Sequence, residues 1–487
     1  MRLMSHVLLG GAGLALRRLR SGGNPEPRTG QLTAQHKQWY NTENFCGNQL
    51  KFSITFAMTI KRDRYLNKLI SFMWNGQIKI VTGLRRCGKS YLLKNIFANY
   101  LKIELGVQDD DILTLNLDEP EFSRFCNPIE LTNHVKAWAT AKSSKRYLFI
   151  DEIQYVEPVQ NPFLPDGRKI TFYDALNSFM HIENLDVYVT GSNSKMLSSD
   201  VLTEFRGRGD EIRLHPVSFA EYYKAFGGDK RDRLEGYLRF GGMPLCIMRK
   251  TDEEKEDYLR SLFDETYFKD IVERRKIERI DVLNHITDFL ASGIGSLTNP
   301  NNIANALITT HKYDISVNTV SSYVRHLTDA FLFSEAKRYD IKGKSFFDYP
   351  NKYYCEDVGL RNARLMFRQQ EETHLMENVI YNELRVRGFK VDVGVVYSWE
   401  RDQRGSARKV AREIDFVVNK RGERVYIQSA YALPTEEKRE SELKPFSLTG
   451  DSFRKIIIRN DMGLRWYDDN GILNISLLDF LLDEAIV

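Results

Sequence analysis

The sequence predicts an α/β fold that begins with a parallel sheet flanked by helices. Apolar runs of strand length recur between residues 60 and 215, at Ile78–Val81, Ile112–Leu117, Tyr147–Ile150, Val187–Thr190 and Ile212–Leu214. Longer amphipathic segments separate most of these runs, and such alternation is typical of a parallel sheet with crossover helices. The first run leads into a glycine-containing loop, Gly83–Ser90, which opens a helical stretch at Tyr91–Tyr100.

Composition indicates a globular protein with more than one domain. The chain has 487 residues, of which 42% are apolar and 28% are charged, and a chain of this length splits into several cores. A net charge of +4 is too small to indicate nucleic-acid binding by itself. No apolar run approaches the roughly 18 residues of a membrane span, so we expect no membrane association.

The cysteines and histidines indicate neither disulfides nor zinc. The nine histidines are dispersed, and the cysteines lack metal-ligand spacing: Cys46, Cys87, Cys126, Cys246 and Cys355. We therefore expect a reducing, cytoplasmic environment. Residues 1–57 are expected to be a disordered tail or sequence upstream of a natural start at Met58, although Arg17, Arg18 and Arg20 leave an organellar transit peptide as the alternative.

The loop Gly83–Ser90 satisfies the pattern G-x-x-x-x-G-K-[ST] in full. Glycines let the backbone wrap closely around phosphates, so that its N–H groups and the next helix N-terminus face them. Lys89 is expected to reach the β- and γ-phosphates of ATP, and the Ser90 hydroxyl to bind Mg²⁺. The expected nucleotide-binding residues are Gly83, Leu84, Arg85, Arg86, Cys87, Gly88, Lys89, Ser90 and Tyr91.

Two carboxylates follow the run Tyr147–Ile150. We expect Asp151 to hold Mg²⁺ through its water shell and Glu152 to polarise the attacking water. After the run Val187–Thr190, Asn193 is the candidate to sense the γ-phosphate, with a helix-capping role as the alternative. Further on, Arg208 in the sequence Phe205-Arg-Gly-Arg-Gly209 is the candidate to stabilise transition-state charge, against an ordinary surface arginine.

These segments resemble a known family. The stretches VTGLRRCGKSYLL, LFIDEIQYV, TGSNSKMLSSDVL and FRGRGDEIRLHPVSFAEYY are similar to the AAA+ ATPases widespread in archaea and bacteria, which join an AAA domain to a C-terminal domain of uncharacterised function. The resemblance runs from about Met58 to near the end of the chain. It implies ATP binding and hydrolysis within the STAND-like branch of AAA+ proteins, and we expect the ATPase domain with its helical lid to span residues 58–275.

Residues 276–357 have the pattern of a winged helix-turn-helix. Two apolar-patterned helices at Asp281–Ser292 and Asn301–Thr309 precede a third that Ser316 can cap. Segments with the pattern of β-strands then flank a basic turn that contains Lys337, Arg338, Lys342 and Lys344. In such a module the third helix enters the DNA major groove while the wing meets phosphates. A purely structural or protein-contact role is the alternative.

Residues 358–487 have an element order similar to the restriction-endonuclease-like fold. In that fold a helix glutamate, a strand-end aspartate and an [E/Q]-x-K strand hold a divalent metal beside a lysine. Glu377, Asp415 and Gln428 stand at the metal-ligand positions, but the lysine position is Ala430. We therefore expect an inactive relative of the nuclease fold. Glu383, on the same helix as Glu377, is expected to be a surface charge.

The function that these patterns predict is hydrolysis of Mg·ATP to drive a conformational switch that engages DNA. An ATP-regulated nuclease and a protein-interaction switch without nucleic acid are the alternatives. A second copy of the chain or another protein remains a candidate partner.

Overall fold

The computed structural model describes residues 60–164, 167–191, 209–368, 371–401, 407–420, 422–461 and 463–487. The chain divides into two units, Met1–Ala57 and Met58–Val487, and all described residues belong to the second. Asn193 and Arg208 lie outside the described residues. Within the described ranges no helix is long and apolar enough to cross a membrane. The cysteines described there, Cys87, Cys126, Cys246 and Cys355, are free thiols.

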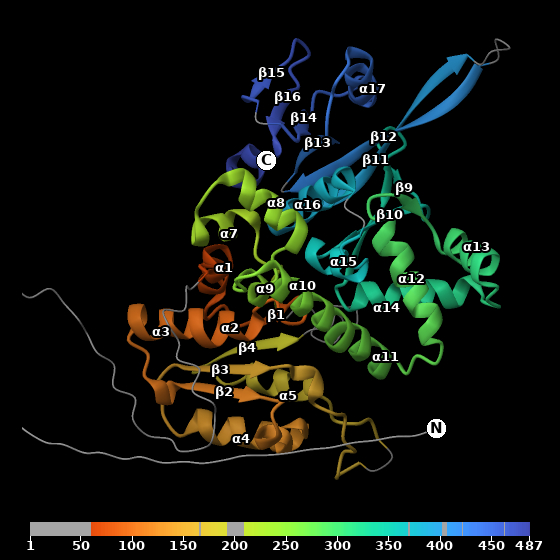
Figure 1. Ribbon diagram of the computed structural model, residues 1–487. Helices are drawn as coiled ribbons and strands as arrows, with labels where there is room; N and C mark the ends of the chain where they lie inside the picture. The colour runs from red at the N-terminus through yellow and green to blue at the C-terminus, as the bar shows by residue number, and fades with distance from the viewer. Residues whose placement is uncertain are drawn as a thin grey trace, which may run out of the picture. The chain divides into compact units, whose positions relative to one another are not determined.

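The five apolar runs form a five-stranded sheet in the order β2-β3-β4-β1-β5 (Figure 1). All of its pairings are parallel, as predicted. The strands are β1 (Ile78–Thr82), β2 (Ile112–Asn116), β3 (Arg146–Asp151), β4 (Leu185–Gly191) and β5 (Gly209–Arg213). Because β4 lies between β1 and β3, the loop after β1 and the carboxylates after β3 face each other across the end of β4.

Both faces of this sheet are buried, and alternate residues of β3 show how. Tyr147 and Phe149 belong to the core on one face, and Leu148 and Ile150 to the core on the other. Period-two alternation sends consecutive side chains to opposite faces, so a strand buried on both faces is apolar throughout. The first face is covered by α1 (Asp63–Phe72), α2 (Lys89–Tyr91), η1 (Leu92–Phe97) and α3 (Ala98–Leu105); the second by α4 (Pro128–Thr140) and α5 (Phe172–Phe179).

A helical region follows the sheet. It comprises α7 (Phe219–Phe226), α8 (Lys230–Phe240), α9 (Pro244–Ile247), α10 (Asp252–Ser261), η6 (Leu262–Phe268) and α11 (Lys269–Arg275). Ser218 and Thr251 start α7 and α10 with capping boxes, in which the hydroxyl and a glutamate three residues on satisfy each other's backbone N–H groups. Short 3₁₀ turns elsewhere are η2 (Asp109–Asp111), η3 (Pro120–Cys126), η4 (Ile153–Tyr155) and η7 (Glu484–Ile486).

Three helices and a small sheet come next, where the sequence predicts a winged helix. They are α12 (Ile280–Ser292), α13 (Pro300–His311) and α14 (Val317–Asp329), with an antiparallel sheet β6-β10-β7 made of β6 (Leu297–Thr298), β10 (Asn351–Cys355) and β7 (Phe333–Ala336). The basic turn does not stand free as a wing. Its strands β8 (Arg338–Asp340) and β9 (Ser345–Phe346) join the C-terminal sheet, where β8 pairs with β11. The winged-helix assignment stays a prediction.

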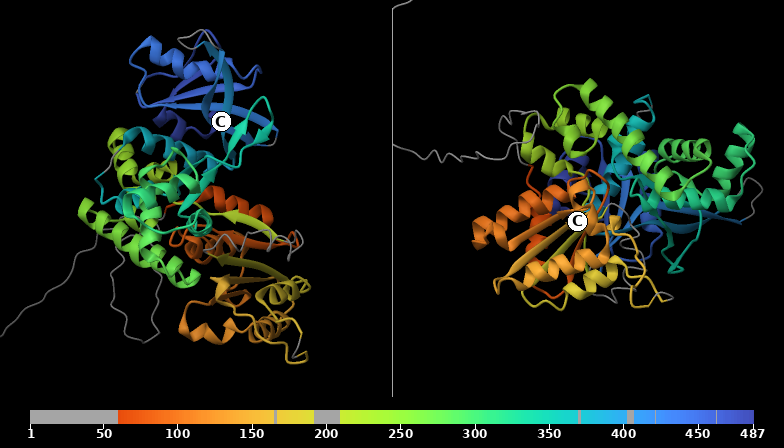
Figure 2. Two further views of the ribbon diagram at one scale, coloured as in Figure 1. Left: turned by 90° about the vertical axis from the view of Figure 1, so that its right-hand side faces the viewer. Right: turned by 90° about the horizontal axis from the view of Figure 1, so that it is seen from below.

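The C-terminal sheet is mixed and eight-stranded, in the order β15-β16-β14-β13-β12-β11-β8-β9. Its own strands are β11 (Lys390–Arg401), β12 (Ala407–Lys420), β13 (Glu423–Ala430), β14 (Arg454–Arg459), β15 (Trp466–Tyr467) and β16 (Leu473–Ser476). The helices of this region are α15 (Val358–Arg364), α16 (Glu372–Val386), α17 (Glu436–Ser447) and α18 (Leu477–Leu482) (Figures 1 and 2). Apolar side chains of α16 pack on one face of this sheet, and Phe446 of α17 packs on the other.

The expectation for Glu383 is wrong. Its side chain is buried, and its Oε1 lies 2.7 Å from Nε of Arg387. The Arg387 guanidinium also donates to the Phe480 carbonyl of α18. Burial raises the pKa of Glu383 above its ordinary value despite this partner. Glu383 therefore helps to join α16 to α18 instead of lying on the surface.

Glycines allow the helical region and α15 to meet backbone against backbone. A Cβ on Gly359, in α15, would lie 2.1 Å from the carbonyl oxygen of Phe240 at the end of α8. A Cβ on Gly242 would lie 2.0 Å from the Val217 carbonyl oxygen. The carboxylate of Asp357 accepts from the Gly242 N–H at 2.7 Å. Any larger residue at these two glycines must push the backbones apart.

We predict that Gly359→Ala destabilises the chain by about 1–3 kcal/mol, because overpacking at a backbone contact forces a shift. The matched control is Gly236→Ala in the interior of α8, where a Cβ meets nothing within 4 Å and alanine should be neutral or stabilising. Denaturant unfolding of both variants measures the difference. A Gly359→Ala variant as stable as the wild type would contradict the tight contact.

Candidate functional site

The loop Gly83–Ser90 connects β1 to α2 and is shaped by its two glycines. Gly83 and Gly88 have φ angles of 140° and 104°, in the region that favours glycine. A Cβ on Gly83 would also lie 2.0 Å from the carbonyl oxygen of Leu214, just after β5. Gly83 is therefore required twice, by its φ angle and by the close approach of the chain that leaves β5. The predicted nucleotide-binding residues Gly83–Tyr91 form this loop and the first turn of its helix.

Lys89 is folded back onto the loop that precedes it. Its side chain is 3% exposed, and its Nζ donates to the carbonyl oxygens of Gly83 and Leu84, each at 3.1 Å. An ammonium that points into the hollow of its own loop can exchange these carbonyls for phosphate oxygens.

The helical region clamps the same loop from outside. The Tyr267 hydroxyl donates to the Arg85 carbonyl at 2.7 Å, and Nη1 of Arg85 lies 3.0 Å from Oδ1 of Asp270 in α11. Cys87 is fully buried, and its thiol contacts the Leu214 carbonyl at 3.5 Å. Arg85 and Cys87 thus tie the loop to the rest of the domain, while Tyr91 is exposed.

Asp151, at the end of β3, lies close to the start of the loop helix. Its Oδ2 is 2.6 Å from Nζ of Lys94, and it also accepts from the Thr190 hydroxyl at the end of β4. Burial acts to raise the pKa of Asp151, but hydrogen bonds from Lys94 and Thr190, with a smaller one from Ser90, hold that pKa below its ordinary value. Asp151 is therefore an ionised carboxylate beside the Ser90 hydroxyl.

Glu152 has a left-handed backbone conformation, with φ 55°, which few non-glycine residues adopt. Its N–H donates to the Thr190 hydroxyl at 3.0 Å, and its carboxylate accepts from the Gln154 amide. Sequence reasoning missed both Thr190 and Lys94. The signal for Thr190 is its place at the end of the predicted strand next to Asp151. Lys94 stands one helical turn after Ser90, and such spacing places both on one face.

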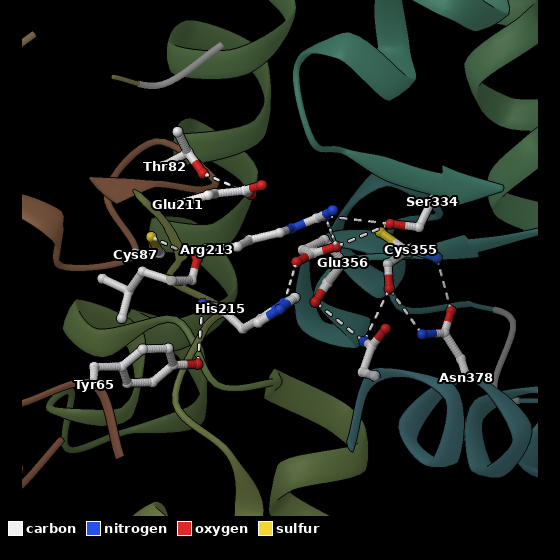
Figure 3. Close-up of polar contacts among 12 residues, drawn as sticks. Tyr65, Thr82, Cys87, Glu211, Arg213, His215, Ser334, Cys355, Glu356 and Asn378 are labelled. Carbon is white, nitrogen blue, oxygen red and sulfur yellow. Dashed lines mark hydrogen bonds and ion pairs between the residues drawn. The ribbon is translucent and has the colours of Figure 1, made fainter. Parts of the chain in front are cut away.

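A buried polar network leads away from the loop (Figure 3). Arg213 and His215 flank Leu214, the residue that contacts Gly83 and Cys87. Nη2 of Arg213 lies 2.9 Å from Oε2 of Glu356, and Nδ1 of His215 lies 2.5 Å from Oε1 of the same carboxylate. The Ser334 hydroxyl of β7 adds a hydrogen bond to Oε2 at 3.1 Å.

Glu356 is the centre of this network and is fully ionised. Burial acts to raise the pKa of Glu356, but Arg213 and then His215 hold it far below its usual range. Burial lowers the pKa of His215, so its imidazole is neutral and donates from Nδ1, and Arg213 supplies the balancing charge.

The network reaches the C-terminal sheet through two asparagines of α16. Asn378 exchanges two hydrogen bonds with the backbone of Cys355, each 2.8 Å long. Asn382 donates to the carbonyl oxygens of Cys355 and Glu356 at 3.0 and 3.1 Å. A continuous set of contacts therefore joins the loop after β1 to α16, the helix that carries Glu377.

The predicted metal ligands Glu377 and Asp415 do come together, but around a lysine. Nζ of Lys352, in β10, lies 2.8 Å from Glu377 Oε1, 2.6 Å from Glu413 Oε1 and 3.5 Å from Asp415 Oδ1. Lys352 is 4% exposed, and the neighbouring Tyr354 hydroxyl donates to Glu377 at 2.6 Å. Neither Lys352 nor Glu413 is among the predicted site residues. Glu413 stands two residues before Asp415, at an alternate strand position, while Lys352 lies on a distant strand.

The third predicted ligand, Gln428, is turned to other partners. Its Oε1 accepts from the Asp415 N–H at 3.3 Å, and its Nε2 donates to Glu442 at 2.8 Å. No group of three or more histidine, cysteine or acidic side chains among the described residues is arranged to hold a metal ion. A divalent metal therefore does not fit between Glu377, Asp415 and Gln428, because the Lys352 ammonium takes that place.

Comparisons with known proteins agree with the fold and the loop. Residues 75–223 match the family model of an AAA domain, so this part of the chain is an AAA domain, the class to which its parallel sheet and glycine loop correspond. A protein of Haemophilus influenzae, called uncharacterised, is 32% identical over 432 residues, which cover 87% of this chain and 98% of that relative. The chain belongs to the same family as the Haemophilus influenzae protein.

Other matches are more distant. An uncharacterised protein of Methanocaldococcus jannaschii is 26% identical over 428 residues, or 84% of this chain and 86% of the relative. Residues 231–371 match a domain of unknown function, DUF8612, which runs across the predicted boundaries after residues 275 and 357. A Walker-type ATPase of Pyrococcus abyssi is 14% identical with a TM-score of 0.45, over 63% of this chain and 96% of the other. A structural likeness at that TM-score adds nothing to the family assignment.

We predict that Lys352→Ala destabilises the chain by about 3–5 kcal/mol above pH 7, because it leaves buried carboxylates without a counter-ion. Lys342→Ala, at an exposed position, is the matched control. Unfolding measured at several pH values tests the prediction.

The loss should shrink at pH 5. Burial already raises the pKa of Asp415 to about 7, above the value of about 3.9 for an unfolded chain. A folded state that binds more protons than the unfolded state loses stability as the pH rises between these values. A loss independent of pH, or no loss, would contradict the ion cluster.

Proposed function

We propose that the chain hydrolyses Mg·ATP at the loop Gly83–Ser90 and uses the reaction to switch the conformation of its C-terminal half. The observation that carries this proposal is the meeting of Lys89, Ser90 and Asp151 at one end of the parallel sheet. An ammonium aimed into a glycine loop, a hydroxyl and an ionised carboxylate suit a triphosphate with its divalent cation.

Each residue has a separate part in the proposed reaction. The loop N–H groups and Lys89 bind the phosphates, with Arg85, Arg86, Cys87 and Tyr91 completing the loop. Ser90 and Asp151 would hold Mg²⁺, which when bound neutralises charge on the phosphates. Lys94 is paired with Asp151 and would have to move away from it when Asp151 binds Mg²⁺. Glu152 orients the attacking water and takes its proton, while Thr190 fixes the Glu152 backbone. Asn193 remains the candidate to sense the γ-phosphate, and Arg208 the candidate to stabilise transition-state charge.

The network centred on Glu356 would carry the switch. Leu214 contacts the loop directly, so a shift of the loop on nucleotide binding moves Arg213 and His215 with it. Since both hold Glu356, and the adjoining backbone is bonded to α16, such a shift biases the position of that helix. A packed, hydrogen-bonded chain of this kind can hold two discrete arrangements.

We propose that the switch engages DNA, through the module of α12–α14 and through the C-terminal domain. Asn318 and Arg325 are exposed on α14, on the face that such a helix would turn toward a groove. The nuclease alternative is disfavoured, because Lys352 fills the place of the metal. A protein-directed switch remains the competing function, and stimulation of hydrolysis by DNA distinguishes the two.

For the catalytic core, we predict that Lys89→Ala lowers ATP hydrolysis by about 10²–10³-fold and weakens ATP binding, through loss of a charged donor to the phosphates. Glu152→Gln should lower hydrolysis by about 10²–10⁴-fold while ATP still binds, as expected for a lost general base. Phosphate release by the full chain, with and without duplex DNA, is the measurement. Lys136→Ala and Glu157→Gln change exposed residues of the same domain and serve as controls. Unaltered hydrolysis in Lys89→Ala would refute the site.

For the coupling, we predict that nucleotide slows hydrogen exchange in α16 of the wild type and that Glu356→Gln abolishes this effect. The substitution removes the charge that joins Arg213 to the backbone beside α16. Exchange mass spectrometry with and without ATP measures it, and Glu423→Gln, at an exposed strand end, is the control. Nucleotide-dependent protection that survives in Glu356→Gln would show that the signal takes another route.

A further inference from the structure

Strands β11 and β12 extend beyond the C-terminal sheet as a two-stranded ribbon (Figure 1). We call the outer segments Val395–Arg401 and Ala407–Glu413 the arm. Residues 402–406, between them, lie outside the described residues and are not included in the arm. Cross-strand pairs place Val395 opposite Glu413, Tyr397 opposite Ala411, and Trp399 opposite Lys409. Residues directly opposite in an antiparallel pair share a face.

One face of the arm is covered by the protein itself. Val396 belongs to the core beneath α17, together with Phe446 of that helix. Glu400, on the same face, accepts from Lys444 of α17 at 3.1 Å and is also paired with Arg412. These contacts cover Val396 and Glu400 on that face.

The opposite face is open and combines aromatic rings with cations. Trp399 is 71% exposed, and its cross-strand partner Lys409 is exposed as well. Nζ of Lys409 lies 3.8 Å from the ring centroid of Tyr397. Arg401, two residues beyond Trp399, is exposed on the same face. Alternate residues of a strand are about 6.8 Å apart, so Tyr397 and Trp399 form a short row of rings.

Within the described residues, the cations of this open face have no carboxylate partner. No described carboxylate forms an ion pair with Arg401 or Lys409, nor with the neighbouring Arg408. The acidic residue nearest the base of the face, Glu413, is held by Lys352 at 2.6 Å. Among the described residues the face therefore presents positive charge without a carboxylate partner, beside the exposed Trp399 ring and the half-buried Tyr397 ring, which suits a polyanion that carries flat groups.

We propose that the open face of the arm binds single-stranded nucleic acid, with bases stacked on Tyr397 and Trp399 and phosphates beside Arg401 and Lys409. This rests on the proposed engagement of DNA and assigns it a surface and a form. Exposed rings interleaved with cations bind unpaired bases, whose faces are accessible, and need no sequence preference. In a duplex the bases are stacked on each other, so a Trp ring standing clear of the ribbon has no base face to meet.

The position of the arm extends this proposal. Glu413 lies at the base of the arm, opposite Val395, and is paired with Lys352. A strand bound along the arm would run toward the cluster of Lys352, Glu377 and Asp415. Because the lysine takes the metal position there, we infer that the strand is held and not cut.

The test is the affinity of the full chain for a fluorescein-labelled oligothymidylate, followed by fluorescence anisotropy. We expect Trp399→Ala to weaken binding by about 5- to 150-fold, the range for one stacked base. Lys409→Ala should reduce the slope of log affinity against log salt by about 0.7, for one phosphate contact on a single strand. Trp466→Ala removes another exposed Trp, at the far edge of the same sheet, and Lys390→Ala an exposed lysine at the base of β11; both should bind like the wild type.

Three results would overturn the assignment: no binding of oligothymidylate, equal affinity in the wild type and Trp399→Ala, or tighter binding of a duplex of the same length. Loss in Trp466→Ala as large as in Trp399→Ala would also overturn it. Phosphate release from ATP, measured on the same samples, separates this proposal from the proposed ATPase. If the chain binds oligothymidylate through Trp399 but releases no phosphate from ATP, only the proposed hydrolysis is refuted. If it hydrolyses ATP but does not bind oligothymidylate, only the proposed binding by the arm is refuted.

Discussion

The buried carboxylate of Glu356 is the interaction on which the arrangement of the described chain depends. Two sequence-distant partners, Arg213 at the end of β5 and Ser334 of β7, meet at one of its oxygens, and His215 meets the other. An isolated charge in this position would be costly, so the carboxylate persists only while all of these elements are assembled. The nucleotide loop lies at one end of this assembly through Leu214, and α16 lies at the other through Asn378 and Asn382. A movement of the loop or of α16 therefore changes the contacts of the buried Glu356 carboxylate with its partners.

The cluster around Lys352 shows the same principle, because buried carboxylates there meet a cation from a distant strand. The ammonium of Lys352, in β10, lies among the carboxylates of Glu377, Glu413 and Asp415 and links the C-terminal sheet to the small sheet before it. The carboxylates therefore serve as the ligands of an internal cation.

Local patterns in the sequence predict the parallel sheet and the nucleotide loop, because each depends on neighbouring residues. The five apolar runs and the spacing of Gly83, Gly88 and Lys89 are of this kind. Lys352 and Glu356 could not be predicted, since their partners come from strands and helices that are distant along the chain. Glu383 was expected on the surface because it is a charged helix residue, but it pairs with Arg387, which donates to α18. Strand β8 pairs with β11 of the C-terminal sheet, and no pattern in the neighbouring sequence predicts this pairing. The position of Glu413 could be predicted only in part. The sequence shows that it stands two residues before Asp415, but it does not show the bulge between Asp392 and Gly394 on the paired strand.

The central claim is that Lys89 and its loop bind ATP. Calorimetric titration of Mg·ATP into the full chain, beside Lys89→Ala and the exposed-site control Lys136→Ala, tests it most directly. We expect one nucleotide bound per chain in the wild type and in Lys136→Ala, and strongly weakened binding in Lys89→Ala. No binding by the wild type, or equal affinity in Lys89→Ala, would contradict it.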